Sequence, residues 1–294
     1  MQALENFKAA LTASDLKVLQ KCLEEAKQPV PVHAQPWYLG DSLGVSLGAT
    51  GYLVHEHANL LKSLRPDWTT LPKGLCWDTP EKTPASRNMA LAQLAEELRT
   101  QGQITGWRDE KFSFWRDEQA PSDRRKEPDP LRAEAFRMER AAFRFFGLRS
   151  HAVHINGFTP EGFMWCGRRS FSKATDPGML DNLAAGGLPA GESLFLCGVR
   201  EMHEEAGLDA AKARQAIEGG QVETCREVKE GWHHENLWIY NLTLPTEFQP
   251  VNQDGEVSEF LCLPPRQVVQ AIEAGSLTVD AGAVIAFSVL SSPS

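Results

Sequence analysis

The chain has 294 residues, of which 42% are hydrophobic, and its formal net charge at pH 7 is −9. A chain of this length and apolar content buries a core without disulfide cross-links, which excludes disordered, collagen-like and coiled-coil classes for most of it. Because 30 basic residues face 39 acidic ones, a nucleic-acid backbone is not attracted over long range, and we expect no nucleic-acid partner.

The cysteines are scattered and form no C-x-x-C pair, which excludes zinc-ribbon and thioredoxin-type sites. They are Cys22, Cys76, Cys166, Cys197, Cys225 and Cys262. We expect free thiols in a reducing compartment. No apolar run reaches the roughly 18 residues of a membrane span, and the N-terminus lacks a secretory apolar core. The sequence therefore predicts a cytoplasmic protein without membrane contact.

The first half of the chain predicts an N-terminal accessory α+β domain over residues 1–146. The expected elements are a helix over 1–28, capped in its second part by Thr12 or Ser14, short strands over 37–56, a helix over 83–101, an aromatic strand over 106–115 and an amphipathic helix over 131–146. The charged, proline-rich segment 121–130 predicts an exposed loop with solvated Arg124, Arg125 and Lys126.

The second half predicts a layered α/β domain over residues 147–294, because strands and helices alternate there. Strands are expected over 151–159, 162–170, 222–229, 235–243 and 257–263, and helices over 193–206, 264–274 and 281–290.

The predicted helix over 193–206 carries three carboxylates on one side. At about 100° per residue, Glu201, Glu204 and Glu205 fall within an arc of about 100°. Carboxylates this close repel one another, so a divalent cation such as Mg²⁺ or Mn²⁺ explains their placement. A solvated acidic face is the competing explanation. The apolar face is expected opposite the carboxylates, with Phe195, Val199, Met202 and Ala206.

The residues before these carboxylates fit the same interpretation. Arg200 lies one turn before Glu204 and can pair with it or with Glu192. Three glycines in the preceding loop permit tight turns and close approach of the backbone to a metal or phosphate: Gly186, Gly187 and Gly191. A helix N-terminus directly after such a loop favours an anion.

This segment resembles the Nudix box, G-x5-E-x7-R-E-U-x-E-E-x-G-U, in which U is a bulky aliphatic residue. The matching positions are Gly186, Glu192, Arg200, Glu201, Met202, Glu204, Glu205, Gly207 and Leu208. Met202 is a mild departure, because Ile, Leu or Val is usual there, and methionine fills a similar volume. The resemblance covers roughly residues 147–290 and implies an α/β/α sandwich.

The resemblance also implies an activity, namely hydrolysis of a diphosphate linked to a further moiety. Glu201, Glu204 and Glu205 would be metal ligands, one of them serving as base, and the Gly186 carbonyl would add a ligand. Bound metals neutralise the bridging phosphates and activate a water for attack on phosphorus.

Further roles follow from the same likeness. Arg200 and Glu192 would support the loop and the helix. Many family members also use a glutamate from a later loop, and Glu256 and Glu259 are the two candidates here.

A second, weaker resemblance extends over most of the chain. Residues 106–115, 136–158 and 168–187 resemble a Nudix subgroup with an extra N-terminal domain. It includes the Nudix part of fungal thiamine pyrophosphokinase and plant and yeast relatives that hydrolyse oxidised thiamine diphosphate. The implied substrate is thiamine diphosphate or an oxidised analogue. ADP-ribose or a nucleoside diphosphate sugar is the alternative, and a non-catalytic ligand sensor is the second alternative.

The subgroup resemblance also implies substrate-binding residues. Arg168, Arg169 and Lys173 would face phosphates, or else form a basic strand end at the surface. Trp107 and Trp165 would stack on a heteroaromatic ring, or else belong to the core.

Two histidine clusters are expected to be structural or solvated, because no third metal ligand is evident for either: His55-Glu56-His57 and His233-His234-Glu235. The N-terminal domain is expected either to close over the active site and select the substrate or to mediate a homodimer.

Overall fold

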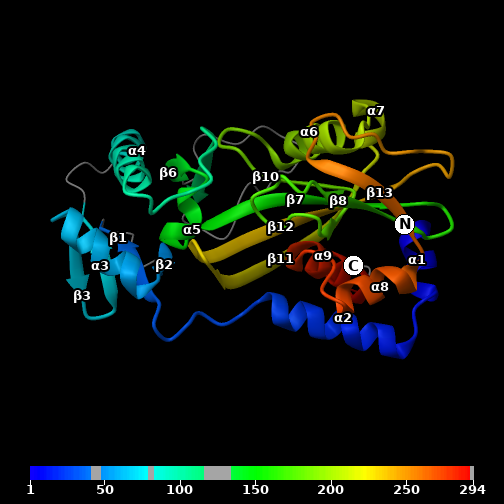
Figure 1. Ribbon diagram of the computed structural model, residues 1–294, viewed down its shortest axis with the longest axis horizontal. Helices are drawn as coiled ribbons and strands as arrows, with labels where there is room; N and C mark the ends of the chain where they lie inside the picture. Colours follow the sequence, from blue (N-terminus) through cyan, green and yellow to red (C-terminus); the bar gives the residue numbers. More distant parts are fainter. Residues whose placement is uncertain (41–47, 79–82, 116–133, 292–294) are drawn as a thin grey trace.

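The computed structural model of the protein describes residues 1–40, 48–78, 83–115 and 134–291. Two lobes lie side by side along its long axis (Figure 1). The loop expected over 121–130, with Arg124, Arg125 and Lys126, lies outside the described residues. Among those described, no helix is both long and apolar enough to cross a bilayer.

The N-terminal lobe is built on a four-stranded sheet in the order β2-β1-β4-β3, in which only β1 and β4 are parallel. Its first elements are β1 (Gln35–Leu39), β2 (Gly51–Leu53), α3 (His55–Leu64), β3 (Trp68–Leu71), β4 (Gly74–Trp77) and α4 (Pro84–Thr100). Helix α4 begins as predicted, because the Thr83 hydroxyl accepts the Ser86 amide and Pro84 occupies the first turn.

The helix expected over 131–146 is wrong for most of its length. Residues 134–139 form strand β6 (Glu134–Glu139), which pairs antiparallel with β5 (Lys111–Trp115), and only α5 (Ala142–Phe146) is helical. Phe136 stacks on Phe114 with ring centroids 5.0 Å apart. The strand is buried on both faces, so its apolar positions do not alternate, and they imitate a helical period.

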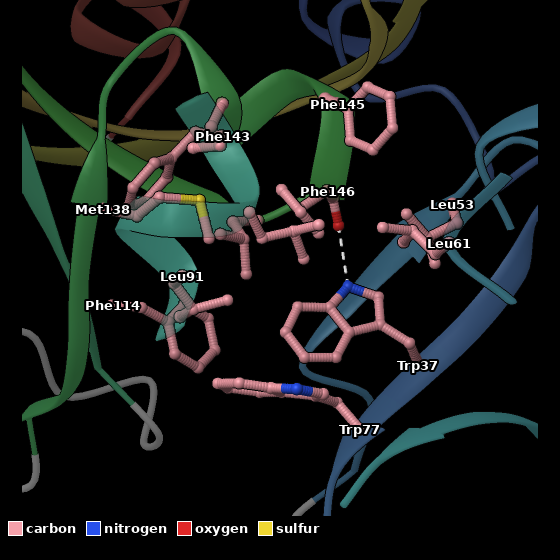
Figure 2. Packing of buried hydrophobic residues seen from close by; sticks show 14 of the residues in the cluster. Trp37, Leu53, Leu61, Trp77, Leu91, Phe114, Met138, Phe143, Phe145 and Phe146 are labelled. Carbon is pink, nitrogen blue, oxygen red and sulfur yellow. Dashed lines mark hydrogen bonds between the residues drawn. The ribbon is translucent and has the colours of Figure 1, made fainter. Parts of the chain in front are cut away.

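Aromatic side chains fill the core of this lobe. Figure 2 shows Trp37 donating its indole N–H to the Phe146 carbonyl at 2.8 Å, beside Trp77 and Phe114. The turn after α5 needs Gly147, whose φ is +58°, because a Cβ there would lie 1.9 Å from the Tyr52 carbonyl oxygen.

The C-terminal lobe holds a mixed sheet in the order β11-β12-β7-β8-β13, with β10 paired to β7 and β9 to β8. Its strands are β7 (Arg149–Phe158), β8 (Met164–Arg169), β9 (Leu180–Asp181), β10 (Ala184–Gly187), β11 (Ile217–Val228), β12 (Gly231–Thr243) and β13 (Val257–Leu263). Strands β7 and β12 run parallel. The strands expected from residue 151 onward are confirmed, although β11 begins five residues earlier than predicted.

Helices cover both faces of this sheet (Figure 1). Helices α6 (Leu194–Ala206) and α7 (Ala210–Ala213) lie on one side, and α8 (Pro265–Glu273) and α9 (Val279–Leu290) lie on the other. The lobe is therefore the expected α/β/α sandwich.

The first two helices pack on the C-terminal lobe rather than beside the sheet of the N-terminal lobe. They are α1 (Gln2–Ala9) and α2 (Ala13–Ala26), and the Thr12–Asp15 capping box begins the second one. Phe7 and Leu19 are fully buried in a cluster with residues of α8 and α9. Hydrophobic residues from the described parts of the chain between 37 and 148 form a separate core.

Candidate active site

Helix α6 places its carboxylates on its buried side. The Ser193 hydroxyl accepts the Leu196 amide at the start, and Gly207, with φ +68°, ends the helix. The buried residues of the helix are Leu194, Cys197, Gly198, Glu201, Met202, Glu205 and Ala206. The expected apolar face is therefore confirmed in part: Met202 and Ala206 are buried in the core, whereas Phe195 and Val199 are only half-buried. The burial of Glu201 and Glu205 beside this face was not expected. The helix packs on β10 and β7 through the side that carries Glu201 and Glu205.

The backbone of β10 lies directly against these two side chains. A Cβ on Gly186 would be 1.9 Å from Oε1 of Glu201, so any larger residue here would displace the Glu201 carboxylate. The Ala185 amide donates to Oε2 of Glu205 at 2.8 Å. The first glycine of the motif thus permits the contact between strand and helix that aims Glu201.

Arg200 forms hydrogen bonds with three carboxylates of the site. Its Nη1 donates to Glu201 at 2.6 Å and to Glu204 at 3.1 Å, and its Nη2 donates to Glu192 at 3.0 Å. Both expected partners, Glu204 and Glu192, are therefore bound at once. One guanidinium fixes the relative positions of three glutamates.

The charge balance at this point favours a cation. Burial raises the pKa of Glu205 well above its ordinary value, and burial also raises the pKa of Glu201, although Arg200 opposes that shift. A single guanidinium does not compensate Glu201, Glu204 and Glu205 together. Clustered carboxylate oxygens are the ligands that Mg²⁺ and Mn²⁺ prefer, so the residues present fit a divalent cation.

A cavity of about 620 Å³ lies in front of these carboxylates and between the two lobes. The C-terminal lobe lines one wall of the cavity with Glu201, Glu204 and Gly186. The N-terminal lobe lines the opposite wall with residues that include Phe112 and Arg140. Its size is that of a small-molecule site.

The match to known proteins agrees with this geometry. Residues 148–280 match the family model of the NUDIX domain. This match identifies residues 148–280, most of the C-terminal lobe, as a Nudix domain. The domain contains the β10 strand, the α6 helix and all the glutamates described above.

Two curated relatives come from Arabidopsis thaliana. "Nudix hydrolase 24, chloroplastic" is 36% identical over 205 residues, which cover 69% of this chain and 53% of the relative. "Nudix hydrolase 20, chloroplastic" is 34% identical over 241 residues, which cover 77% of this chain and 60% of the relative. The chain thus spans only about half to three fifths of the length of these relatives.

A solved structure with a similar fold is the Nudix domain of Shewanella oneidensis NrtR, crystallised with ADP ribose. It is 18% identical, covers 48% of this chain and 87% of its own, and has a TM-score of 0.39.

Of the two later glutamates considered, Glu256 lines the cavity and Glu259 does not. Glu256 pairs with Lys173. Burial raises its pKa, but the Lys173 hydrogen bond and the charges of Lys173, Arg108 and Arg140 outweigh that effect and lower it. Glu259 pairs with Arg168 at the surface of the Nudix domain. Glu256 is therefore the candidate that shares the cavity with the glutamates of α6.

The three cations predicted to face phosphates also differ in whether they line the cavity. Arg169 and Lys173 line the cavity, and Arg168 does not. Arg169 donates to Asp181 at 2.8 Å and to the Thr175 carbonyl at 2.9 Å. The structure thus does not support Arg168 as a phosphate ligand, because its side chain is held by Glu259 outside the cavity.

Neither tryptophan considered for ring stacking lines the cavity. Trp107 donates its indole N–H to Asp109 at 2.8 Å, and the Arg99 guanidinium lies 4.7 Å from its ring centroid. Trp165 is buried in the core of the Nudix domain. Both occupy the structural positions that were the alternative expectation.

The histidine cluster His233-His234-Glu235 lies next to an acidic residue that is far from it in the sequence. Asp280, at the start of α9, lies with its Oδ2 3.5 Å from Nε2 of His233, which is 3.8 Å from Oε2 of Glu235. All three line the cavity. The Arg226 guanidinium binds both oxygens of Asp280 at 2.8 and 2.9 Å, so this group is part of an ion-pair network in the cavity wall.

In the first cluster, His55-Glu56-His57, His57 has a structural role, whereas His55 and Glu56 are exposed at the start of α3. The His57 ring stacks on Phe145 with centroids 3.8 Å apart, and its Nδ1 lies 3.1 Å from the Phe145 carbonyl.

The residues of the N-terminal lobe that line the cavity were missed by sequence reasoning. Arg108, Glu110, Arg140 and Arg144 lie in the segments 106–115 and 136–158 of the subgroup resemblance, but no role was predicted for them, because their place in the cavity depends on the docking of the lobes. The alternation of aromatic residues over 106–115 indicated a strand but gave no signal for its contact with the Nudix domain.

Proposed function

We propose that this protein is a divalent-metal-dependent hydrolase that cleaves the diphosphate bond of a small molecule. Glu201, Glu204 and Glu205 are the proposed metal ligands, together with the Gly186 carbonyl and Glu256. The observation that carries the proposal is that Glu201, buried against β10, and Glu204 line a cavity of small-molecule size, with the buried carboxylate of Glu205 behind them. The relatives that are named as Nudix hydrolases support it.

The residues of the chain have separate tasks in this reaction. When bound, a divalent cation supplies charge neutralisation at the bridging phosphates and activates a water for attack on phosphorus. Arg200 holds Glu201 and Glu204 in position, and Glu192 holds Arg200. Lys173 and Arg169 are the proposed phosphate-facing cations of the Nudix domain, although each is also paired with a carboxylate of the cavity wall, Glu256 and Asp181 respectively.

For the substrate, we propose thiamine diphosphate or an oxidised analogue, hydrolysed to the monophosphate. The resemblance over residues 106–115, 136–158 and 168–187 supports this choice. The charge of the cavity supports it as well, because acidic side chains outnumber basic ones in its lining. Such a wall favours a substrate whose non-phosphate part is a cationic heterocycle.

Cleavage of a panel of diphosphates, with and without Mg²⁺, tests both proposals; it is followed as phosphate released directly from the thiamine compounds and as phosphate that an added phosphomonoesterase frees from the products of the others. The panel holds thiamine diphosphate, its oxidised analogues, ADP-ribose, nucleoside diphosphate sugars and dinucleotide polyphosphates. We expect Mg²⁺-dependent release from the thiamine compounds. Release from ADP-ribose alone would keep the hydrolase and reject the thiamine substrate, and binding without release of phosphate would reject the hydrolase in favour of a ligand sensor.

A further inference from the structure

The N-terminal lobe forms part of the wall around the proposed catalytic centre. The Ala190 amide, in the loop before α6, donates to the Lys111 carbonyl of β5 at 2.7 Å. The Phe112 side chain lies on Gly187, where a Cβ would be 2.4 Å from its ring. Strand β5 is thus fixed directly over the loop that begins the Nudix helix, and the cavity lies between the two lobes.

Six cationic side chains line this cavity, and their partners differ. Carboxylates already bind five of them: Arg140, Arg144, Arg169, Lys173 and Arg200. Within the described residues, the Arg108 side chain has neither a carboxylate nor a hydrogen-bond partner, and it is exposed to the cavity. Its charge is therefore available to a ligand.

The loop that carries Arg108 is held in place by several contacts. The buried Glu139 carboxylate accepts the Arg108 amide at 3.0 Å and the Ala141 amide at 3.4 Å. Asp109 has φ +58°, a left-handed conformation that costs energy for any residue with a side chain, and its carboxylate accepts the Trp107 indole N–H. Trp107 thus positions the loop rather than stacking on a ligand.

Arg108 and Glu256 line the same cavity, one from each lobe. The charge of Arg108 acts on the Glu256 carboxyl together with that of Arg140. A diphosphate bound to a cation at the glutamates of α6 keeps negative charge on its other oxygens, and a guanidinium binds two phosphate oxygens at once.

We propose that Arg108 is a substrate-binding residue that the N-terminal lobe supplies to the Nudix active site, where it binds a phosphate group of the diphosphate. The inference rests on the proposed function, since both place the diphosphate in this cavity. The N-terminal lobe thereby completes the site within one chain.

The test measures, by calorimetry, how strongly the full chain binds methylenediphosphonate in the presence of Mg²⁺. This diphosphate analogue cannot be hydrolysed. Loss of a hydrogen bond between charged groups costs about 1.5–3 kcal/mol, so Arg108→Gln should weaken binding by about 10- to 100-fold. Arg108→Lys keeps the positive charge but lacks the paired N–H donors of the guanidinium, so this variant should bind with intermediate strength. The matched control is Arg137→Gln, because Arg137 lies on β6 outside the cavity and pairs with Glu134.

The thermal midpoint Tm of each variant reports on folding, and KM and kcat are measured on any diphosphate that the wild type hydrolyses. Arg108→Gln should raise KM more than it lowers kcat. Wild-type binding by Arg108→Gln, or a loss as large in Arg137→Gln, would overturn the inference while leaving the hydrolase untouched. Binding that depends on Arg108 in a protein that hydrolyses nothing would reject the proposed function and support the inference.

Discussion

Glu205 is 7% exposed beneath the backbone of β10, where its carboxylate accepts the Ala185 amide. Burial raises its pKa, so ionised Glu205 is costly to the folded protein in the absence of a cation. A group with a raised pKa in the fold contributes stability below its unfolded pKa, and this contribution is lost as the pH rises through the folded value. The ionised carboxylate that Glu205 would offer to a cation therefore lowers the stability of the cation-free protein.

The first prediction follows from the raised pKa of Glu205. In the presence of EDTA, Glu205→Gln should raise Tm at pH 8 by about 2–4 °C, the shift that 1 kcal/mol produces in a domain of this size. The gain should shrink as the pH falls toward 4.5, the ordinary pKa of a glutamate. The same variant should lose the increase in Tm that Mg²⁺ gives the wild type. The exposed Glu273→Gln serves as control, and an equal gain there would contradict the explanation.

Gly186 gives a second prediction at the same scale. Gly186→Ala forces Glu201 to move, because the added methyl group would lie 1.9 Å from its Oε1. A displacement of about 1 Å at a catalytic group costs on the order of 10²-fold in rate. We expect kcat/KM to fall by about that factor while circular dichroism still reports a folded protein. An unchanged kcat/KM would show that the position of Glu201 does not matter for turnover.

Among the elements, α6 could be predicted and β6 could not. The spacing of Glu201, Glu204 and Glu205 together with Gly207 specifies a helix with a defined end, and the structure confirms it. What the helical wheel could not supply was the direction in which α6 faces its sheet, because polar residues rarely occupy the buried side of a helix. Strand β6 was hidden because both its faces are buried, one of them through Phe136 against Phe114.

The contact of β5 with the Nudix domain is open to a test of its own. Phe112 is 6% exposed, lines the cavity and covers Gly187. Truncation of a buried phenylalanine costs about 3–5 kcal/mol, so Phe112→Ala should lower Tm by several degrees. Because β5 then holds the loop before α6 less firmly, KM should rise as well. A drop in Tm with unchanged KM would assign Phe112 to the core of the lobe alone.

On the scale of the whole molecule, the cavity depends on how two lobes and the first two helices are assembled. The match over residues 148–280 and the box within it made the sandwich predictable. The sequence could not show that α1 and α2 pack on α8 and α9, since their apolar stripes carry no mark of their partner. The same holds for Arg108, whose role depends on a contact between residues far apart in the chain.

The central claim is that metal-dependent cleavage of a diphosphate takes place at the glutamates of α6. It is tested most directly by Mg²⁺-dependent cleavage of the best substrate of the panel, compared between the wild type and Glu204→Gln. Glu204 is half-exposed, so the variant should keep its Tm and lose turnover by at least about 100-fold, as expected when a group that acts on the reacting atoms is removed. Turnover by Glu204→Gln at the wild-type rate would contradict the account and place the metal elsewhere.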